Sequence, residues 1–168
     1  MTSTFKPINP NDVKAVTCLG AGPIGAGWAA YFLAHGYTVT SYIHSLDEEP
    51  ALRLLIENAW ISLKQLGLSE GASLDNLTCT NNLKEAVSTA DFIQESVPEN
   101  IDLKQGVYAQ LGDLAPTNVV IASSTSGLSM TDIQAYCATP LRTVVGHPFN
   151  PPYLLPLVEI VKGDQTAP

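Results

Sequence analysis

The sequence is short of basic residues. It holds 8 Lys and Arg against 16 Asp and Glu in 168 residues, which gives a formal net charge of −8. Proteins that bind nucleic acids need a basic surface to displace the counterions around phosphates, and anionic membranes attract basic segments in the same way. The composition therefore argues against nucleic-acid and membrane partners and is compatible with a cationic substrate.

Cysteine and long apolar runs are also scarce. The three cysteines, Cys18, Cys79 and Cys137, are far apart and odd in number, so they fit neither a disulfide framework nor a zinc site. No apolar run approaches the length of a membrane span, and residues 1–11 lack the apolar core of a signal peptide. We therefore expect a cytoplasmic protein with reduced thiols at or near the core and no bound metal.

Short apolar runs alternate with segments of helical periodicity along almost the whole chain. The expected strands span residues 13–19, 38–43, 77–80, 91–97, 119–123, 143–147 and 157–161, and the expected helices span residues 24–34, 48–66, 83–87, 100–114 and 129–136. This alternation predicts an α/β fold, a single domain built on a doubly wound, mostly parallel sheet of the Rossmann dinucleotide-binding type.

A glycine-rich loop joins the first expected strand to the first expected helix. It reads Gly20-Ala21-Gly22-Pro23-Ile24-Gly25. In such a loop the first glycine allows a tight turn, the second lets the backbone approach a pyrophosphate, and the third lets helix and strand pack closely. Free N–H groups at the helix start then face the phosphates. The strand–loop–helix context favours a dinucleotide site over an ordinary glycine-rich turn.

The acid that normally binds the adenosine ribose is missing. It is expected about 20 residues after the loop, at the end of the second strand, where Ile43 and His44 stand, and the first acid is Asp47. No arginine precedes Arg53 to hold a 2′-phosphate instead. We take NAD as the expected cofactor and leave NADP open.

A second group of candidate residues consists of Ser126, His147 and Glu159. If the last two strands pair antiparallel around a turn near Tyr153, His147 and Glu159 lie opposite each other, so that the carboxylate can orient the imidazole as a general base. A lone strand histidine is about as often structural as catalytic. The serine-rich run at residues 123–127, taken without its context, is more typical of a plain polar loop. The residues alone leave both interpretations open.

Four stretches carry a resemblance to the 3-hydroxyacyl-CoA dehydrogenase superfamily. They are GAGPIGAGWA at residues 20–29, DFIQESVPE at 91–99, IASSTSG at 121–127 and GHPFNPPYLLPLVE at 146–159. The similarity is strongest to the branch that oxidises the 3-hydroxyl of L-carnitine. Pro148 follows the histidine there, whereas acyl-CoA enzymes usually carry Phe, and the gulonate dehydrogenase and crystallin branch remains close.

The resemblance implies a role for each matching position. His147 corresponds to the catalytic base, Glu159 to its carboxylate partner, and Ser126 to a serine that contacts both substrate and nicotinamide. The positions implied to line the nicotinamide end of the cofactor are Glu99, Lys104 and Asn150. The implied reaction is NAD-dependent hydride transfer from the 3-hydroxyl carbon of a carnitine-like acid, which gives a 3-keto product.

The resemblance also sets expectations about domains and alternatives. Residues 1–168 correspond to the cofactor domain, and we expect the family's helical C-terminal domain, which builds the dimer, to be absent from this sequence; a homodimer is left open. An acyl-CoA substrate predicts basic residues in 47–75, but only Arg53 and Lys64 occur there, among six acids. The alternatives are therefore 3-hydroxyacyl-CoA or L-gulonate oxidation, or dinucleotide binding without catalysis. Tyr153 is either one wall of an ammonium-binding cage or a packing residue.

Overall fold

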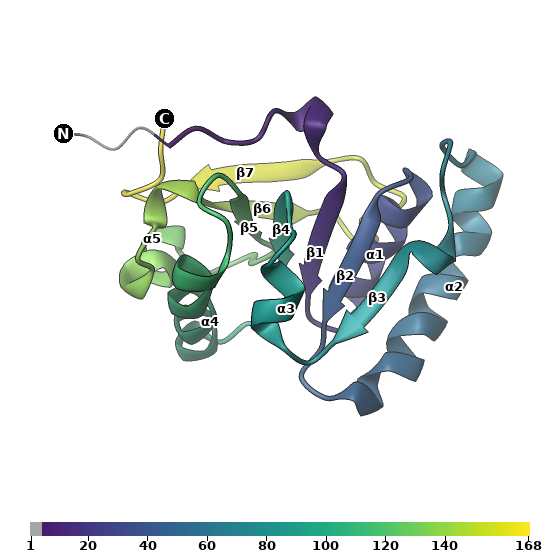
Figure 1. The fold of residues 1–168 in the computed structure, drawn as a ribbon, viewed down its shortest axis with the longest axis horizontal. Coiled ribbons are helices and arrows are strands. Elements are labelled where there is room, and N and C mark those ends of the chain that lie inside the picture. The colour runs from purple at the N-terminus through teal and green to yellow at the C-terminus, as the bar shows by residue number, and fades with distance from the viewer. Residues whose placement is uncertain (1–4) are drawn as a thin grey trace.

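Seven strands form one sheet in the order β3-β2-β1-β4-β5-β6-β7 (Figure 1). The computed structural model describes residues 5–168. The expectation that residues 1–11 are not a signal peptide therefore falls partly, at residues 1–4, outside the described residues. The strands are β1 (Ala15–Leu19), β2 (Thr38–Tyr42), β3 (Leu77–Thr80), β4 (Phe92–Glu95), β5 (Val120–Ser123), β6 (Thr143–Pro148) and β7 (Val158–Lys162). The helices are α1 (Pro23–Ala34), α2 (Glu49–Leu66), α3 (Leu83–Val87), α4 (Ile101–Leu114) and α5 (Met130–Ile133).

The sheet is parallel from β3 through β6, and β7 alone runs antiparallel to its neighbour. The predicted doubly wound α/β class is therefore confirmed. Each expected element is present with ends that differ by at most two residues, except that the expected helix 129–136 divides into α5 and a 3-10 turn, Gln134–Tyr136. Ser129 caps α5 as expected, since its side chain accepts the Thr131 N–H.

Two apolar cores lie on opposite faces of the sheet. The first gathers residues of α1 and α2 over β1 and β2, and the second gathers residues of α3, α4 and α5 over β4 and β5. In Figure 1 the two groups of helices are also separated along the sheet, with α1 and α2 toward one end and α4 and α5 toward the other. Because the strands from β3 through β6 run parallel, their carboxyl ends lie in a row at one edge of the sheet, where such folds place their ligands. Within residues 5–168, no helix is long and apolar enough to cross a membrane.

Arg142, the last residue of the 3-10 turn Pro140–Arg142 before β6, closes the C-terminal end of α4. The residue is 2% exposed, and its guanidinium donates to the carbonyl oxygens of Leu111, Gly112 and Ala115 at 3.1–3.2 Å, and also to that of Pro116. The Leu111 carbonyl also accepts the Ala115 N–H at 3.1 Å, whereas the carbonyls that follow it at the helix end depend on partners from outside the helix. Burial lowers the pKa of the Arg142 guanidinium, although the Cys137 thiol nearby opposes that shift.

We expect Arg142→Met to lower the free energy of unfolding by about 2 kcal/mol or more, because buried carbonyls lose their donors. Urea denaturation followed by circular dichroism measures this loss. The matched control is Lys6→Met, which removes an exposed cation and is expected to leave stability unchanged. Equal stability of the two variants would show that Arg142 does not hold α4 in place.

Candidate active site

The glycine loop lies between the end of β1 and the start of α1. Gly20 has φ of +106°, and a Cβ added there would lie 2.5 Å from the Ser96 carbonyl oxygen. A Cβ at Gly25 would lie 2.1 Å from the Gly20 carbonyl oxygen, whereas one at Gly22 would meet nothing within 4 Å. The fold itself therefore requires glycine at positions 20 and 25. At Gly22 the space is open on the side where a pyrophosphate would approach the helix start.

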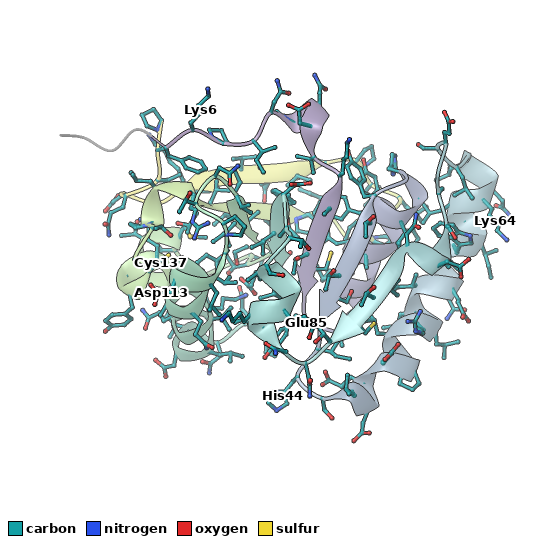
Figure 2. The ribbon with its side chains drawn as sticks, in the orientation of Figure 1. Lys6, His44, Lys64, Glu85, Asp113 and Cys137 are labelled. Atoms are coloured by element: carbon teal, nitrogen blue, oxygen red, sulfur yellow. The ribbon has the colours of Figure 1, made fainter. Side chains whose placement is uncertain are left out.

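The position after β2, where an acid is expected to bind the ribose, belongs to the apolar core in this structure. Ile43 is fully buried in the core formed by α1 and α2, so its side chain does not face a ligand. The next residue, His44, is exposed, and Figure 2 shows it pointing away from the body of the protein beyond β2. Glu48 folds back to this corner, where its Oε2 accepts the His44 backbone N–H at 3.0 Å.

His147 and Glu159 face each other across the β6–β7 pair. The register places them directly opposite, and His147 Nδ1 lies 2.8 Å from Glu159 Oε2. A carboxylate only accepts, so Nδ1 carries the hydrogen and Nε2 of the neutral ring is left with its lone pair. The side chain of His147 is 28% exposed and that of Glu159 is 58% exposed. The pairing predicted from the sequence is present, with the imidazole oriented as a general base requires.

The loop between β6 and β7 packs on α1, close to the glycine loop. A Cβ at Gly27 would lie 2.9 Å from Cδ of Pro152, so the absence of a side chain there admits this contact. Tyr153 packs against the first core and is only partly exposed, which supports a packing role rather than one wall of a cage. Asn150, at the start of this loop, is exposed. The hairpin that carries His147 is therefore fixed against the helix that begins at the phosphate loop.

Glu99 holds the loop that carries Ser126. Its Oε1 accepts the Thr125 hydroxyl at 2.5 Å, the Ser126 N–H at 3.1 Å and the Gly127 N–H at 3.2 Å. The Ser126 residue itself is exposed. Partial burial opposes ionisation of Glu99, but the Thr125 and backbone hydrogen bonds and the charge of Lys104 outweigh it and lower the pKa of this carboxyl. Glu99 thus places Ser126 at the edge of the sheet next to β4 and β5.

Beneath Glu99 lies a buried ion pair that the sequence reasoning did not identify. Lys104 is 1% exposed and its Nζ donates to Glu95 Oε1 at 2.7 Å and to the Val97 carbonyl at 3.2 Å. Glu95 is fully buried and also accepts the Val97 N–H at 2.7 Å and the Ser123 hydroxyl at 2.6 Å. Because a buried charge needs several partners, this arrangement fixes both loops at the ends of β4 and β5. Lys104 therefore holds the loop after β4 in place from its buried side, next to the expected nicotinamide site. Direct contact of Lys104 with the cofactor stays a prediction.

The cysteines take no part in this edge of the sheet. All three are free; Cys18 and Cys137 are buried and Cys79 is half-buried, as expected for core or near-core thiols. Burial raises the pKa of the Cys18 thiol to about 12. Burial and the neighbouring Glu49 raise that of Cys79 to about 11. These two thiols stay protonated at neutral pH and are poor nucleophiles.

A hollow of about 470 Å³ opens at the opposite edge of the sheet, among Lys6, Asn118 and Arg142. Figure 2 shows Lys6 at the far end of the molecule from His44. The residues that line the hollow precede β1, β5 and β6, so the hollow lies at the amino ends of the strands. Because parallel sheets of this kind bind ligands at the carboxyl ends, the edge with Gly22, Ser126 and His147 is the candidate active site.

The lowered pKa of Glu99 predicts a pH effect on stability. The folded-state pKa lies below the ordinary value of 4.5, so the unfolded chain binds more protons and the stabilisation is lost as the pH falls through the folded-state value. We expect Glu99→Gln to flatten the loss of stability below about pH 4.5, as measured by urea denaturation across that range. Parallel pH curves for wild type and Glu99→Gln, or the same flattening in the exposed control Glu57→Gln, would contradict this account.

A doubly wound sheet with a glycine loop at its first crossover and an oriented histidine at the same edge is typical of the nucleotide-cofactor domains of dehydrogenases. Residues 15–168 match the family described as "3-hydroxyacyl-CoA dehydrogenase, NAD binding domain". The chain belongs to this family, which confirms the expected resemblance and supports NAD as the cofactor.

Curated relatives and solved structures agree with this assignment. The chain is 57% identical over 159 residues to an L-carnitine dehydrogenase of Streptomyces coelicolor, covering 95% of this chain and 50% of the relative. It is 47% identical over 157 residues to an L-carnitine dehydrogenase of Pseudomonas putida, covering 94% and 49%. The solved 3-hydroxybutyryl-CoA dehydrogenase of Escherichia coli K12 superposes with a TM-score of 0.84 at 30% identity, covering 93% of this chain and 34% of that one. The chain spans about half the length of the curated relatives it matches.

Proposed function

We propose that this chain is the NAD-binding and base-carrying part of an enzyme that oxidises the 3-hydroxyl of L-carnitine to 3-dehydrocarnitine. The observation that carries the proposal is the 2.8 Å contact between His147 and Glu159 at the edge that also holds the glycine loop. An imidazole oriented by a carboxylate, beside a dinucleotide site, suits removal of a proton from a hydroxyl whose carbon gives up a hydride.

In this mechanism His147 Nε2 accepts the proton of the 3-hydroxyl, and Glu159 stabilises the resulting imidazolium through Nδ1–H. The C3–H bond breaks, its electron pair leaves as hydride, and a carbonyl forms at C3. The acceptor for that hydride would be supplied by the nicotinamide of NAD, held at this edge of the sheet. Ser126 orients the substrate hydroxyl, and residues 20–25 hold the pyrophosphate. The side chains proposed for the nicotinamide end are Glu99, Lys104 and Asn150.

Carnitine is the proposed substrate for two reasons. The relatives that match along most of this chain at 47–57% identity are named L-carnitine dehydrogenases. The face around α2 is also acidic, and Arg53, one of its two cations, is paired with Glu49 at 2.8 Å. Such a face is poorly suited to the phosphates of coenzyme A. This ranks 3-hydroxyacyl-CoA below carnitine; L-gulonate remains the other small-substrate alternative.

We assign residues 1–168 to the cofactor domain and propose that full turnover also uses the part of the relatives that this chain does not span. Binding of NAD without turnover is therefore the second candidate for the isolated chain, and the half-length coverage is the observation that favours it. A homodimer stays a prediction, which sedimentation velocity would test.

The experiment follows NADH formation at 340 nm with L-carnitine, a 3-hydroxyacyl-CoA and L-gulonate in parallel, together with thermal shift by NAD and NADP. Reduction with L-carnitine alone is the expected outcome for a complete site. Thermal stabilisation by NAD without turnover would support the binding-only candidate. Reduction with the acyl-CoA alone would overturn the carnitine assignment, and stabilisation by NADP alone would overturn the cofactor assignment.

A further inference from the structure

Gln94, on β4, is buried beneath the carboxyl edge and reaches toward β6. It is 2% exposed, and its Nε2 donates to the Ser124 hydroxyl at 2.8 Å and to the Gly146 carbonyl at 3.2 Å. A carbonyl oxygen only accepts, so the contact with Gly146 identifies this atom as the amide nitrogen. The side chain thus spans from β4 to β6 on one face of the sheet.

The residues between these strands leave room for that reach. Gln94 pairs with Ala122 of β5, whose side chain is small. A Cβ at Gly146 would lie 3.2 Å from Ala122 Cβ and 3.6 Å from Gln94 Oε1, so a larger residue at 146 would crowd the amide. The small residues at 122 and 146 therefore fit a long amide side chain at 94.

The Gly146 carbonyl belongs to the peptide group that holds the backbone nitrogen of His147. Peptide groups are planar, so fixing that oxygen also fixes the position of the His147 Cα. The register between β5 and β6 ends at the pair of Ser123 and Val145, and the last residues of β6 continue with β7 as their paired strand. Gln94 contacts β6 where β5 has stopped.

We propose that Gln94 is a positioning residue for the histidine base. Glu159 fixes the imidazole ring of His147, and Gln94 fixes the backbone that carries it. Through Ser124, whose hydroxyl lies 2.8 Å from that of Ser96, the same amide connects His147 to the wall of the glycine loop. The inference rests on the proposed function, because it assigns the geometry of the same base.

The test uses Gln94→Met, which keeps the side-chain length and removes the donor, in the full chain. Gln134→Met is the matched control, since Gln134 is also fully buried but contacts Thr143 at the start of β6. The first readout is the ¹⁵N spectrum of the imidazoles at alkaline pH, where an ordinary histidine is neutral. The chain has three histidines, and His147→Ala assigns the signal of interest.

We expect wild type and Gln134→Met to show His147 as the Nδ1–H tautomer, and Gln94→Met to show an average of both tautomers. Where the wild type turns over, Gln94→Met is expected to lower kcat roughly 10- to 100-fold with little change in KM for NAD, because the base is misplaced. The tautomer readout needs no turnover, so it separates failure of this inference from failure of the proposed function.

Ser124→Ala distinguishes the two hydrogen bonds of the Gln94 amide, because it removes only the one to Ser124. It leaves the Gly146 contact in place, and the His147 tautomer is expected to stay as in wild type. If Gln94→Met does not fold, Gln94→Glu replaces it. Its ionised carboxylate can accept from the Ser124 hydroxyl, which reverses the wild-type bond, but it has no proton for the Gly146 carbonyl. An unchanged His147 signal in the folded Gln94 variant, or equal changes in Gln94→Met and Gln134→Met, would overturn the proposal.

Discussion

His147→Ala is expected to lower the rate of NADH formation by about 10²- to 10⁴-fold, the usual contribution of a general base. The affinity for NAD is expected to stay within about twofold of wild type, because the proposed role of the imidazole is toward the substrate hydroxyl. Steady-state kinetics at 340 nm and isothermal titration with NAD measure the two quantities.

The matched control for this variant is His35→Ala, which removes an exposed histidine at the end of α1. Rate and affinity should both be unchanged there. If His147→Ala loses NAD affinity in proportion to its rate, the histidine is a structural residue of the cofactor site. If it retains the full rate, another group supplies the base.

Gly22→Ala is expected to weaken NAD binding by at least about tenfold, since its methyl group would fill the space where the backbone approaches the pyrophosphate. The free protein should keep its melting temperature, because a Cβ at this position meets nothing within 4 Å. Calorimetric titration and differential scanning calorimetry test the two halves of this prediction.

Two other glycines serve as references. Gly25→Ala is expected to destabilise the fold itself, because its Cβ would lie 2.1 Å from the Gly20 carbonyl oxygen. Gly106→Ala, on α4 with open space around it, is expected to preserve NAD affinity and to gain slightly in stability. Unchanged NAD affinity in Gly22→Ala would mean that the pyrophosphate does not pass over this loop.

The fold could be predicted from the sequence because its signals are local. The apolar run before Gly20 and the β-branched run after Gly36 mark strands on either side of a helix of small residues. The contact between His147 and Glu159 could also be predicted, because an antiparallel hairpin around residue 153 pairs positions that are equidistant from it. Both inferences need only the spacing within one segment.

The supporting polar groups could not be predicted, because their partners come from distant segments. Gln94 and Glu95 are adjacent in β4, and their side chains point to opposite faces of the sheet. Which atoms they meet depends on the order β4-β5-β6, and on α4 covering one face. The polar pair at the end of a buried strand was the available signal, since such residues are rarely buried without partners.

The ribose position shows the same limit. The sequence shows that an acid is missing at Ile43, but not that Ile43 is fully buried or that Glu48 returns a carboxylate to the end of β2. The resemblance implied a place for Lys104 at the nicotinamide end, but the sequence did not show that Glu95 holds its ammonium beneath the loop. In both cases the side-chain direction follows from tertiary packing rather than from the local pattern.

An NMR titration of the ¹⁵N-labelled chain with NAD tests the central claim most directly, since it locates the site without requiring turnover. We expect the largest amide shifts on Gly20, Gly22, Ser126 and His147, at the carboxyl ends of β1, β5 and β6. Shifts confined to the hollow around Asn118 and Arg142 at the opposite edge, or no saturable shifts at all, would contradict it.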